Sequence, residues 1–184
     1  MPPADTPRLT FRSWREEDEP LALALWGDPK VTALIDARGA LDAEAVRRKL
    51  RAEIDREREH GVQYWPIFLR DGGALAGCCG LRPYQPGVLE LGFHLRPEHW
   101  GQGHATEAAR SAIEHAFSRL GAAALFAGHH PRNDASRRTV LKLGFRYTGD
   151  EPYAATGLLH PSYRLERSEW ADRPPSTSGP TSTT

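Results

Sequence analysis

The most constraining feature of the sequence is a run of apolar residues with helical spacing between residues 105 and 120. Apolar side chains recur three, four and seven positions apart, which is the pattern of an amphipathic helix. These residues are Ala105, Ala108, Ala109, Ala112, Ile113, Ala116, Phe117 and Leu120. The many alanines allow close packing, so we expect this helix to lie on a sheet and to end at Gly121.

Strand and helix patterns alternate on both sides of this helix. The predicted strands cover residues 8–13, 64–69, 74–81, 88–95, 122–127, 145–148 and 162–166. Further helices are predicted at 15–26, from Asp42 with Val46, Leu50 and Ile54 on one face, and at 134–143. The order β-α-α-β-β-β-α-β-α-β-β places antiparallel hairpins before a βαβ unit. It predicts a mixed α/β fold.

Length and composition indicate one packed domain. The chain has 184 residues, of which 39% are hydrophobic and 26% charged, so a single well-filled core is expected. We assign this domain to residues 1–170. Residues 171–184 are rich in Pro, Ser and Thr and have little to bury, which predicts a disordered tail.

Charge and cysteine content exclude several classes of protein. Lys and Arg number 24 and so do Asp and Glu, which argues against nucleic-acid or membrane-surface binding. The longest apolar runs, such as Leu21–Trp26, are too short to span a bilayer. The adjacent Cys78 and Cys79 rarely fit disulfide geometry. No signal peptide is visible, so we expect a cytoplasmic protein.

A glycine-rich turn joins the strand at 88–95 to the alanine-rich helix. The segment reads ELGFHLRPEHWGQGHATE from Glu90 to Glu107. Gly101 and Gly103 let the backbone turn N–H groups outward, and the helix start adds unpaired donors and a positive dipole end. This predicts a nest for a phosphate, although a connector without a ligand is an equal alternative from spacing alone. A Walker loop is absent, and Thr106 replaces the third glycine of a dinucleotide fingerprint.

Two blocks of sequence resemble a known family. The run HWGQGHATEA after ELGFHL is similar to the acetyl-CoA-binding segment of GNAT acetyltransferases, most of all the RimJ/RimL-type branch. A second block, from Asn133 to Phe145, resembles that branch's N-x-x-S-x-R run ending in LGF. The opening TPRLTFRSW and the element from Asp28 to Val31 also fit. The resemblance covers residues 6–168 and implies that the domain is a GNAT N-acetyltransferase.

The resemblance implies a set of residues that bind acetyl-CoA. Its pyrophosphate would lie on Trp100, Gly101, Gln102, Gly103, His104, Ala105 and Thr106. Its pantetheine arm would pair with the backbone of Phe93, His94, Leu95 and Arg96. Asn133 would hold the pantetheine from the opposite side, and Ser136 would lie near the thioester sulfur.

Acetyl transfer to an amine needs a base, an oxyanion site and a way for the thiolate to leave. Glu90 is our candidate base, working through a water, and a surface carboxylate is the alternative. Backbone N–H groups near His94 and Leu95 would face the thioester carbonyl if the strand bulges. Ser136 could donate to the thiolate, or it could cap the last helix together with Asn133. Many family members carry a tyrosine acid where this chain has Val140.

The histidines and aromatic residues have simpler interpretations. His94, His99 and His104 are spaced by five and do not share a helix face, so no metal site is expected among the eight histidines. Trp14, Trp26 and Trp65 fit a core or its rim. By resemblance only, Tyr84, Tyr153 and Trp65 would wall the acceptor pocket.

The predicted function is transfer of the acetyl group of acetyl-CoA to a primary amine by direct attack in a ternary complex. The amine would belong to a small molecule or a protein N-terminus, and residues 27–41 and 149–161 would form the acceptor loops. A sensor that binds acyl-CoA without turnover is the alternative. We expect acetyl-CoA and an amine as partners, no metal, no nucleic acid and no membrane, and a monomer or homodimer.

Overall fold

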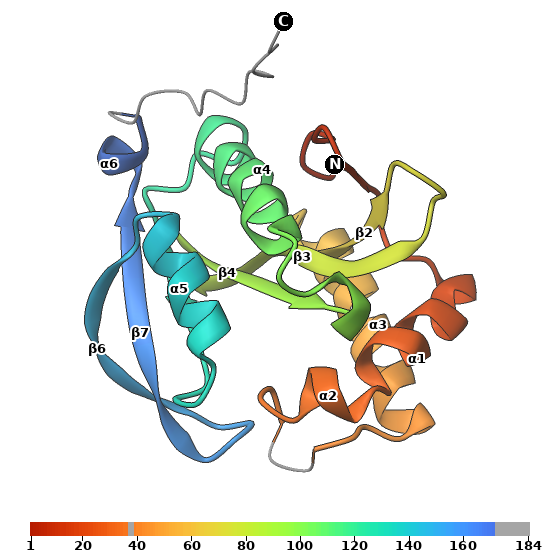
Figure 1. Ribbon diagram of the computed structural model, residues 1–184. Helices are drawn as coiled ribbons and strands as arrows, with labels where there is room; N and C mark the ends of the chain where they lie inside the picture. Colours follow the sequence, from red (N-terminus) through yellow and green to blue (C-terminus); the bar gives the residue numbers. More distant parts are fainter. Residues whose placement is uncertain (37–38, 172–184) are drawn as a thin grey trace, which may run out of the picture.

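The centre of the fold is a seven-stranded mixed sheet, seen in a computed structural model that describes residues 1–36 and 39–171 (Figure 1). The strand order is β1-β2-β3-β4-β5-β7-β6. Within the described part of the chain, β4 and β5 run parallel and the other neighbouring strands are antiparallel. The strands are β1 (Leu9–Phe11), β2 (Tyr64–Leu69), β3 (Leu75–Gln85), β4 (Val88–Leu95), β5 (Ala124–Gly128), β6 (Arg146–Tyr153) and β7 (Leu158–Glu166).

Helices cover both faces of the sheet. They are α1 (Glu19–Trp26), α2 (Pro29–Thr32), α3 (Ala43–His60), α4 (His104–Ser118), α5 (Asp134–Lys142) and α6 (Arg167–Ala171), with 3-10 turns at Glu16–Asp18 and Pro97–His99. One hydrophobic core lies between the sheet and α4 with α5. The other lies between the sheet and α1 with α3.

The alanine face of α4 packs as its sequence predicts. Ala108, Ala109, Ala112 and Ala116 are fully buried against the sheet. The helix ends at Ser118, so Leu120 lies beyond it and is 39% exposed. Gly121 follows with a φ of 70°, a left-handed conformation that favours glycine.

The mixed α/β fold and the order of its main elements are confirmed. The structure adds two short helices, α2 and α6, and it extends β3 to Gln85. It also extends the last two strands, which were expected at 145–148 and 162–166, to Arg146–Tyr153 and Leu158–Glu166. Of the predicted tail, residue 171 ends α6 and residues 172–184 lie outside the described residues.

The parallel pair β4–β5 separates after a short contact. Its register is Val88 with Ala124, Leu89 with Leu125 and Glu90 with Phe126. Beyond Glu90, β4 continues to Leu95 paired only with β3, while β5 continues to Gly128 paired with β7. The sheet therefore opens between the carboxyl ends of its two parallel strands, which is where open α/β sheets bind ligands.

The two adjacent cysteines lie on opposite faces of β3. Cys78 belongs to the core under α1 and α3, and Cys79 to the core under α4. Both are free and fully buried. Burial raises the pKa of the Cys78 thiol to about 12, and it raises the pKa of the Cys79 thiol well above its usual value.

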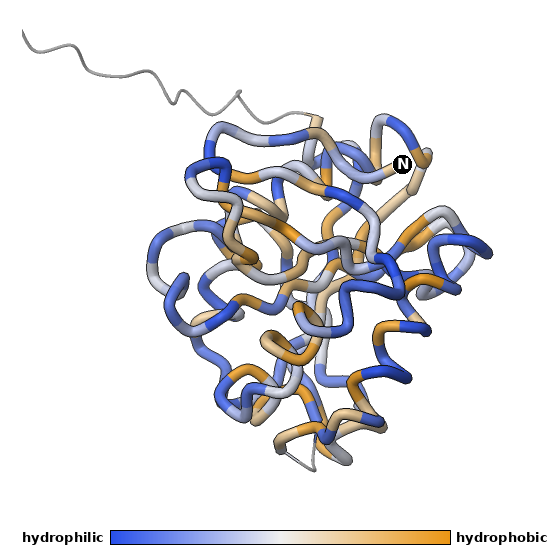
Figure 2. Tube along the Cα trace, turned by 90° about the vertical axis from the view of Figure 1, so that its right-hand side faces the viewer, coloured by the Kyte–Doolittle hydropathy of each residue, from blue (hydrophilic) through white to orange (hydrophobic). Residues whose placement is uncertain are grey.

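Hydrophobic residues are interspersed with hydrophilic ones along the trace (Figure 2). Among the described residues, no helix combines the length and the apolar character that a membrane span requires.

Candidate active site

Two cavities meet beside the opening between β4 and β5. The larger, of about 570 Å³, lies between the glycine loop, the end of β4 and α5. The smaller, of about 280 Å³, lies between β4, β5, α3 and the β6–β7 hairpin. The residues that line both are Leu34, Ile35, Phe93, His94, Asn133 and Ser136. A molecule in one cavity can therefore contact a molecule in the other at this junction.

The start of α4 faces the larger cavity without a side-chain cap. Gly101 and Gly103 have φ angles of 73° and 81°, and Gly103 is the N-cap residue. The first helical hydrogen bond runs from the Glu107 amide to the Gly103 carbonyl. The amides that precede it, including those of Ala105 and Thr106, are left as donors at the positive end of the helix, which suits an anion.

Basic side chains add positive charge to the larger cavity. Lys30 comes from α2, and Arg132, Arg138 and Lys142 come from the loop before α5 and from α5 itself. Among the described residues that line this cavity, Asp134 is the only acidic one. Its surroundings therefore favour a ligand with several negative charges.

The N-terminal segment braces the glycine loop from outside the cavity. Arg8 donates from Nη1 to the carbonyl of Gln102 at 3.0 Å, and its Nε is 2.6 Å from Glu107 Oε2. The Thr6 hydroxyl donates to Glu107 Oε1 at 2.6 Å. These contacts join the segment just before β1 to the glycine loop and to the first turn of α4, which lie far apart from it in the sequence.

The free edge of β4 exposes a definite set of backbone groups. The Arg96 amide donates to the Ala76 carbonyl at 2.9 Å. In an antiparallel pair the backbone N–H groups point alternately toward the partner strand and away from it, so this bond shows which residues of β4 face β3. His94, two residues earlier and opposite Cys78, also turns its amide toward β3, whereas Phe93 and Leu95 turn theirs away. Leu95 accepts a hydrogen bond from the Trp100 indole at 2.8 Å on that open side.

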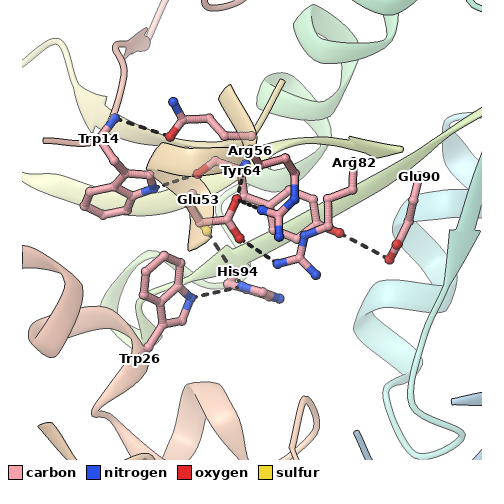
Figure 3. A network of polar contacts seen from close by, with 10 residues as sticks. Trp14, Trp26, Glu53, Arg56, Tyr64, Arg82, Glu90 and His94 are labelled. Atoms are coloured by element: carbon pink, nitrogen blue, oxygen red, sulfur yellow. Dashed lines mark hydrogen bonds and ion pairs between the residues drawn. The ribbon is translucent and has the colours of Figure 1, made fainter. Parts of the chain in front are cut away.

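The His94 side chain has a fixed tautomer. Trp26 Nε1 donates to His94 Nδ1 at 3.2 Å, and Cys78 Sγ lies 3.7 Å from the same nitrogen (Figure 3). Because an indole N–H only donates, Nδ1 is the acceptor and the proton of the neutral ring is on Nε2. Burial, and then the charges of Lys49 and Arg82, hold the pKa of His94 well below its usual value. His94 therefore brings a neutral imidazole, with Nε2 as its donor nitrogen, to the junction of the two cavities.

Glu90 lies in the smaller cavity and is held by Tyr64. The Tyr64 hydroxyl donates to Glu90 Oε1 at 3.2 Å (Figure 3). Burial, and next the charge of Glu90, raise the pKa of Tyr64 well above its usual value, so the phenol keeps its proton. A Cβ at Gly92 would lie 2.1 Å from the Tyr64 hydroxyl, so glycine is required there for this approach.

A buried ion cluster supports this wall of the cavity. Glu53 accepts from Arg82 Nη2 at 2.7 Å, from Arg56, and from the Tyr64 amide at 2.9 Å. Burial acts to raise the pKa of Glu53, but Arg82 and Arg56 outweigh it and hold that pKa below its usual value. The Arg82 guanidinium lies 3.9 Å from the centre of the Tyr64 ring. Arg82 thus packs on the ring of the phenol that contacts Glu90 (Figure 3).

Comparison with known proteins decides the family. A family model described as an acetyltransferase (GNAT) domain matches residues 8–146. This chain belongs to the GNAT acetyltransferase family. Its members are acyltransferases, and the opening between β4 and β5 is the candidate active site of this one.

Individual relatives agree with this assignment. An uncharacterized N-acetyltransferase, p20, of Bacillus licheniformis is 28% identical over 146 residues, covering 78% of this chain and 82% of that protein. A GNAT-family acetyltransferase from Bacillus anthracis shares the fold with a TM-score of 0.78 and 21% identity, covering 92% of this chain and 100% of that one. RimL, a ribosomal L7/L12 alpha-N-protein acetyltransferase crystallised with coenzyme A, gives 0.75 and 18%, covering 90% and 98%.

The larger cavity brings together most of the residues predicted to bind the cofactor. The predicted residues that line the larger cavity are Phe93, His94, Leu95, Trp100, Gly101, Gly103, His104, Ala105, Thr106, Asn133 and Ser136. The Trp100 amide donates to the Pro97 carbonyl, so Trp100 has its side chain, and not this amide, to offer to a ligand. Arg96 and Gln102 do not line the cavity. The Arg96 guanidinium pairs with Glu98, and the Gln102 amide group donates to the Glu98 carbonyl.

Asn133 and Ser136 begin α5 at the junction. Asn133 Oδ1 accepts from the Ser136 amide at 3.0 Å, so Asn133 caps the helix. Both residues also line both cavities, so capping and a role in the site are compatible. Val140, one helical turn further on, is buried against the smaller cavity.

The aromatic wall of the smaller cavity differs from the expectation at one residue. Tyr84 stacks on Phe126 with ring centres 4.1 Å apart, and Tyr153 lies against His160. Tyr84 and Tyr153 line the cavity, but Trp65 does not. The expectation for Trp65 is wrong because β2 turns that side chain into the core under α4, where it donates to Glu57.

Among the residues that the structure describes, no group of three or more His, Cys, Asp or Glu side chains could hold a metal ion. His130 and His160 pack edge to face with centres 5.7 Å apart in the smaller cavity, and both have lowered pKa values because of burial.

Proposed function

We propose that the protein transfers the acetyl group of acetyl-CoA to a primary amine by direct attack in a ternary complex. The observation that carries this proposal is the meeting of two cavities at the open edge of β4. A thioester in the larger cavity and an amine in the smaller one would meet there without an acyl-enzyme.

Several features support acetyl-CoA as the donor. The uncapped start of α4 and the cations Lys30, Arg132, Arg138 and Lys142 fit a molecule with a pyrophosphate and a further phosphate. The open edge of β4 from Phe93 to Leu95 offers the pantetheine backbone partners, with Asn133 across the cavity. RimL, which has this fold, was crystallised with coenzyme A.

Glu90 is proposed to prepare the amine. An amine attacks only when it is neutral, and Glu90 would take its proton through a water. The Tyr64 hydroxyl fixes one oxygen of Glu90 and leaves the other free for that water. Tyr64 itself is a poor proton acceptor, because it stays protonated.

Two donors are proposed to stabilise the oxyanion. The Leu95 amide lies on the open side of β4, and His94 Nε2 carries a proton at the junction. A preorganised donor of this kind accelerates acyl transfer by a factor on the order of 10² to 10³. A neutral imidazole is suited to this because it needs no change of protonation during the step.

Ser136 is proposed to donate a hydrogen bond to the departing thiolate. It lies at the start of α5 and lines both cavities. The buried Val140 has no proton to donate, which leaves this role to the serine hydroxyl or to a water that it holds.

Release of coenzyme A tests the proposal. The protein would be incubated with acetyl-CoA and a panel of primary amines, and free thiol and acetylated product would be measured together. We expect equal amounts of thiol and product with at least one amine. Tight binding of acetyl-CoA without thiol release for every amine would favour the sensor instead.

A further inference from the structure

The smaller cavity contains one charged side chain that has no polar partner among the described residues. Four charged residues line it, namely Lys49, Arg82, Glu90 and Glu151. Arg82 is paired with Glu53, Glu90 accepts from Tyr64, and Glu151 accepts from Tyr84 at 2.5 Å. Lys49 forms no hydrogen bond or ion pair with any other described residue.

Lys49 lies against Trp26 in the cavity wall. It is a half-buried residue of α3, and its Nζ lies 5.0 Å from the centre of the Trp26 ring. The same Trp26 side chain donates to His94 Nδ1. One indole therefore positions both the ammonium group of Lys49 and the imidazole at the junction.

The carboxylate whose charge acts most strongly on Lys49 is already engaged by two arginines. Glu53 is shared by Arg56 and Arg82, so one buried carboxylate already has two guanidinium partners. Burial, and next Arg82, lower the pKa of Lys49, and the charge of Glu53 does not offset them. An ammonium group that is partly withdrawn from water is stabilised by a paired anion. Glu90 and Glu151 also line the cavity, so this preference for an anion is local to Lys49.

We propose that Lys49 binds a carboxylate of the acceptor, and that the acceptor is a small primary amine that also carries a carboxylate. The amine would lie toward Glu90 and the junction, and the carboxylate toward Lys49. This inference rests on the proposed acetyl transfer and adds the substrate class. A cavity of about 280 Å³ fits a molecule of amino-acid size.

Matched pairs of acceptors test the inference. Phenylalanine would be compared with phenylalaninamide, and 4-aminobutanoate with 4-aminobutanamide, by the kcat/KM for coenzyme A release. We expect the acid to exceed its amide by about tenfold or more in at least one pair, since charged hydrogen bonds are worth about 1.5–3 kcal/mol.

Substitutions show whether Lys49 causes the preference. Lys49→Met keeps the apolar stem and should bring the acid-to-amide ratio toward one, whereas Lys49→Arg should retain part of it. Arg48→Met removes an exposed positive charge from the same helix and should leave the ratio unchanged. A ratio near one in the unmodified protein, or a ratio that Lys49→Met does not change, overturns the inference.

A binding measurement keeps this test independent of turnover. The chain has three lysines, Lys30, Lys49 and Lys142, so spectra of protein with ¹³C-labelled lysine contain few signals. Saturating phenylalanine or 4-aminobutanoate should raise the pKa of Lys49, and the amides should not. If the amides are acetylated and the pKa of Lys49 does not change with either acid, the carboxylate site is refuted and the proposed acetyl transfer stands. If no amine is acetylated but the acids raise the pKa of Lys49, the proposed acetyl transfer is refuted and the carboxylate site stands.

Discussion

The contact between Trp26 and His94 determines what the histidine can do. Since Nδ1 accepts from the indole, His94 presents a proton at the junction and cannot take one there. Its low pKa keeps the ring neutral at physiological pH. This geometry supports the proposal that His94 acts as a hydrogen-bond donor and that Glu90 is the base.

Replacement of His94 tests this assignment. His94→Ala should lower kcat by about 10² or more with a smaller change in the KM for acetyl-CoA. His94→Gln can keep an N–H donor near the same place and should retain part of the rate. Steady-state kinetics of both variants would check this. A His94→Gln enzyme as slow as His94→Ala, together with a loss of a kinetic pKa, would indicate that the histidine takes a proton instead.

Replacement of Glu90 tests the proposed base. Glu90→Gln can still accept from the Tyr64 hydroxyl but cannot take a proton, so kcat/KM at neutral pH should fall about 10²- to 10⁴-fold. The loss should shrink at high pH, where more of the amine is already neutral. The measurement is kcat/KM against pH for both proteins. Parallel profiles for the two proteins would contradict this role.

At the scale of elements, the turn before α4 is the feature that sequence patterns predict best. Glycines, a helix start and an apolar period of 3.6 residues lie within a short stretch, so local rules are sufficient. The β6–β7 hairpin is harder to predict from its sequence. Its first strand is almost wholly exposed and contains Gly149 and Pro152, so it lacks the alternation of apolar residues that marks a half-buried strand.

A substitution at the start of α4 tests its part in binding. Gly103→Glu would place a carboxylate at the positive helix end and strain a φ of 81°, so it should abolish acetyl-CoA binding. Calorimetric titration with coenzyme A measures this. Gly72→Glu is the matched control, because Gly72 has a φ of 78° in the distant β2–β3 turn and should keep full affinity. Unchanged affinity in Gly103→Glu would count against the assignment of this loop.

At the scale of the whole molecule, buried and half-buried histidines couple stability to pH. Burial is the main cause of lowered pKa values at His94, His104, His115, His130 and His160. In the unfolded chain these groups bind protons as the pH falls through about 6.5, whereas the folded protein resists that protonation. The free energy of unfolding should therefore decrease from pH 7.5 to pH 5.5.

Urea unfolding at several pH values checks this expectation. His115 packs edge-on to Trp65 outside the active site, so His115→Gln should give a shallower decrease than the unmodified protein. The lowered pKa values of Asp18, Glu53 and Glu107 add a further loss of stability only at more acidic pH, as these carboxylates become protonated. A free energy of unfolding that stays constant or rises from pH 7.5 to 5.5 would contradict the prediction.

The polar network of the site is what sequence reasoning missed. Tyr64 and Glu90 are 26 positions apart, Glu53 and Arg82 are 29 apart, and Trp26 and His94 are 68 apart. No local periodicity connects such residues, and each alone resembles an ordinary core or surface residue. Glu53 has one weak signal, because it falls on the apolar side of α3, between Leu50 and Ile54. Such a network becomes visible only when the sheet order is known.

The burial of the two cysteines has a practical consequence for any enzymology on this protein. A thiol attacks chromogenic disulfides as its thiolate, and Cys78 and Cys79 are neutral and inaccessible in the native fold. Colour that develops during turnover would therefore come from released coenzyme A alone, and any slow background would report partial opening of the fold.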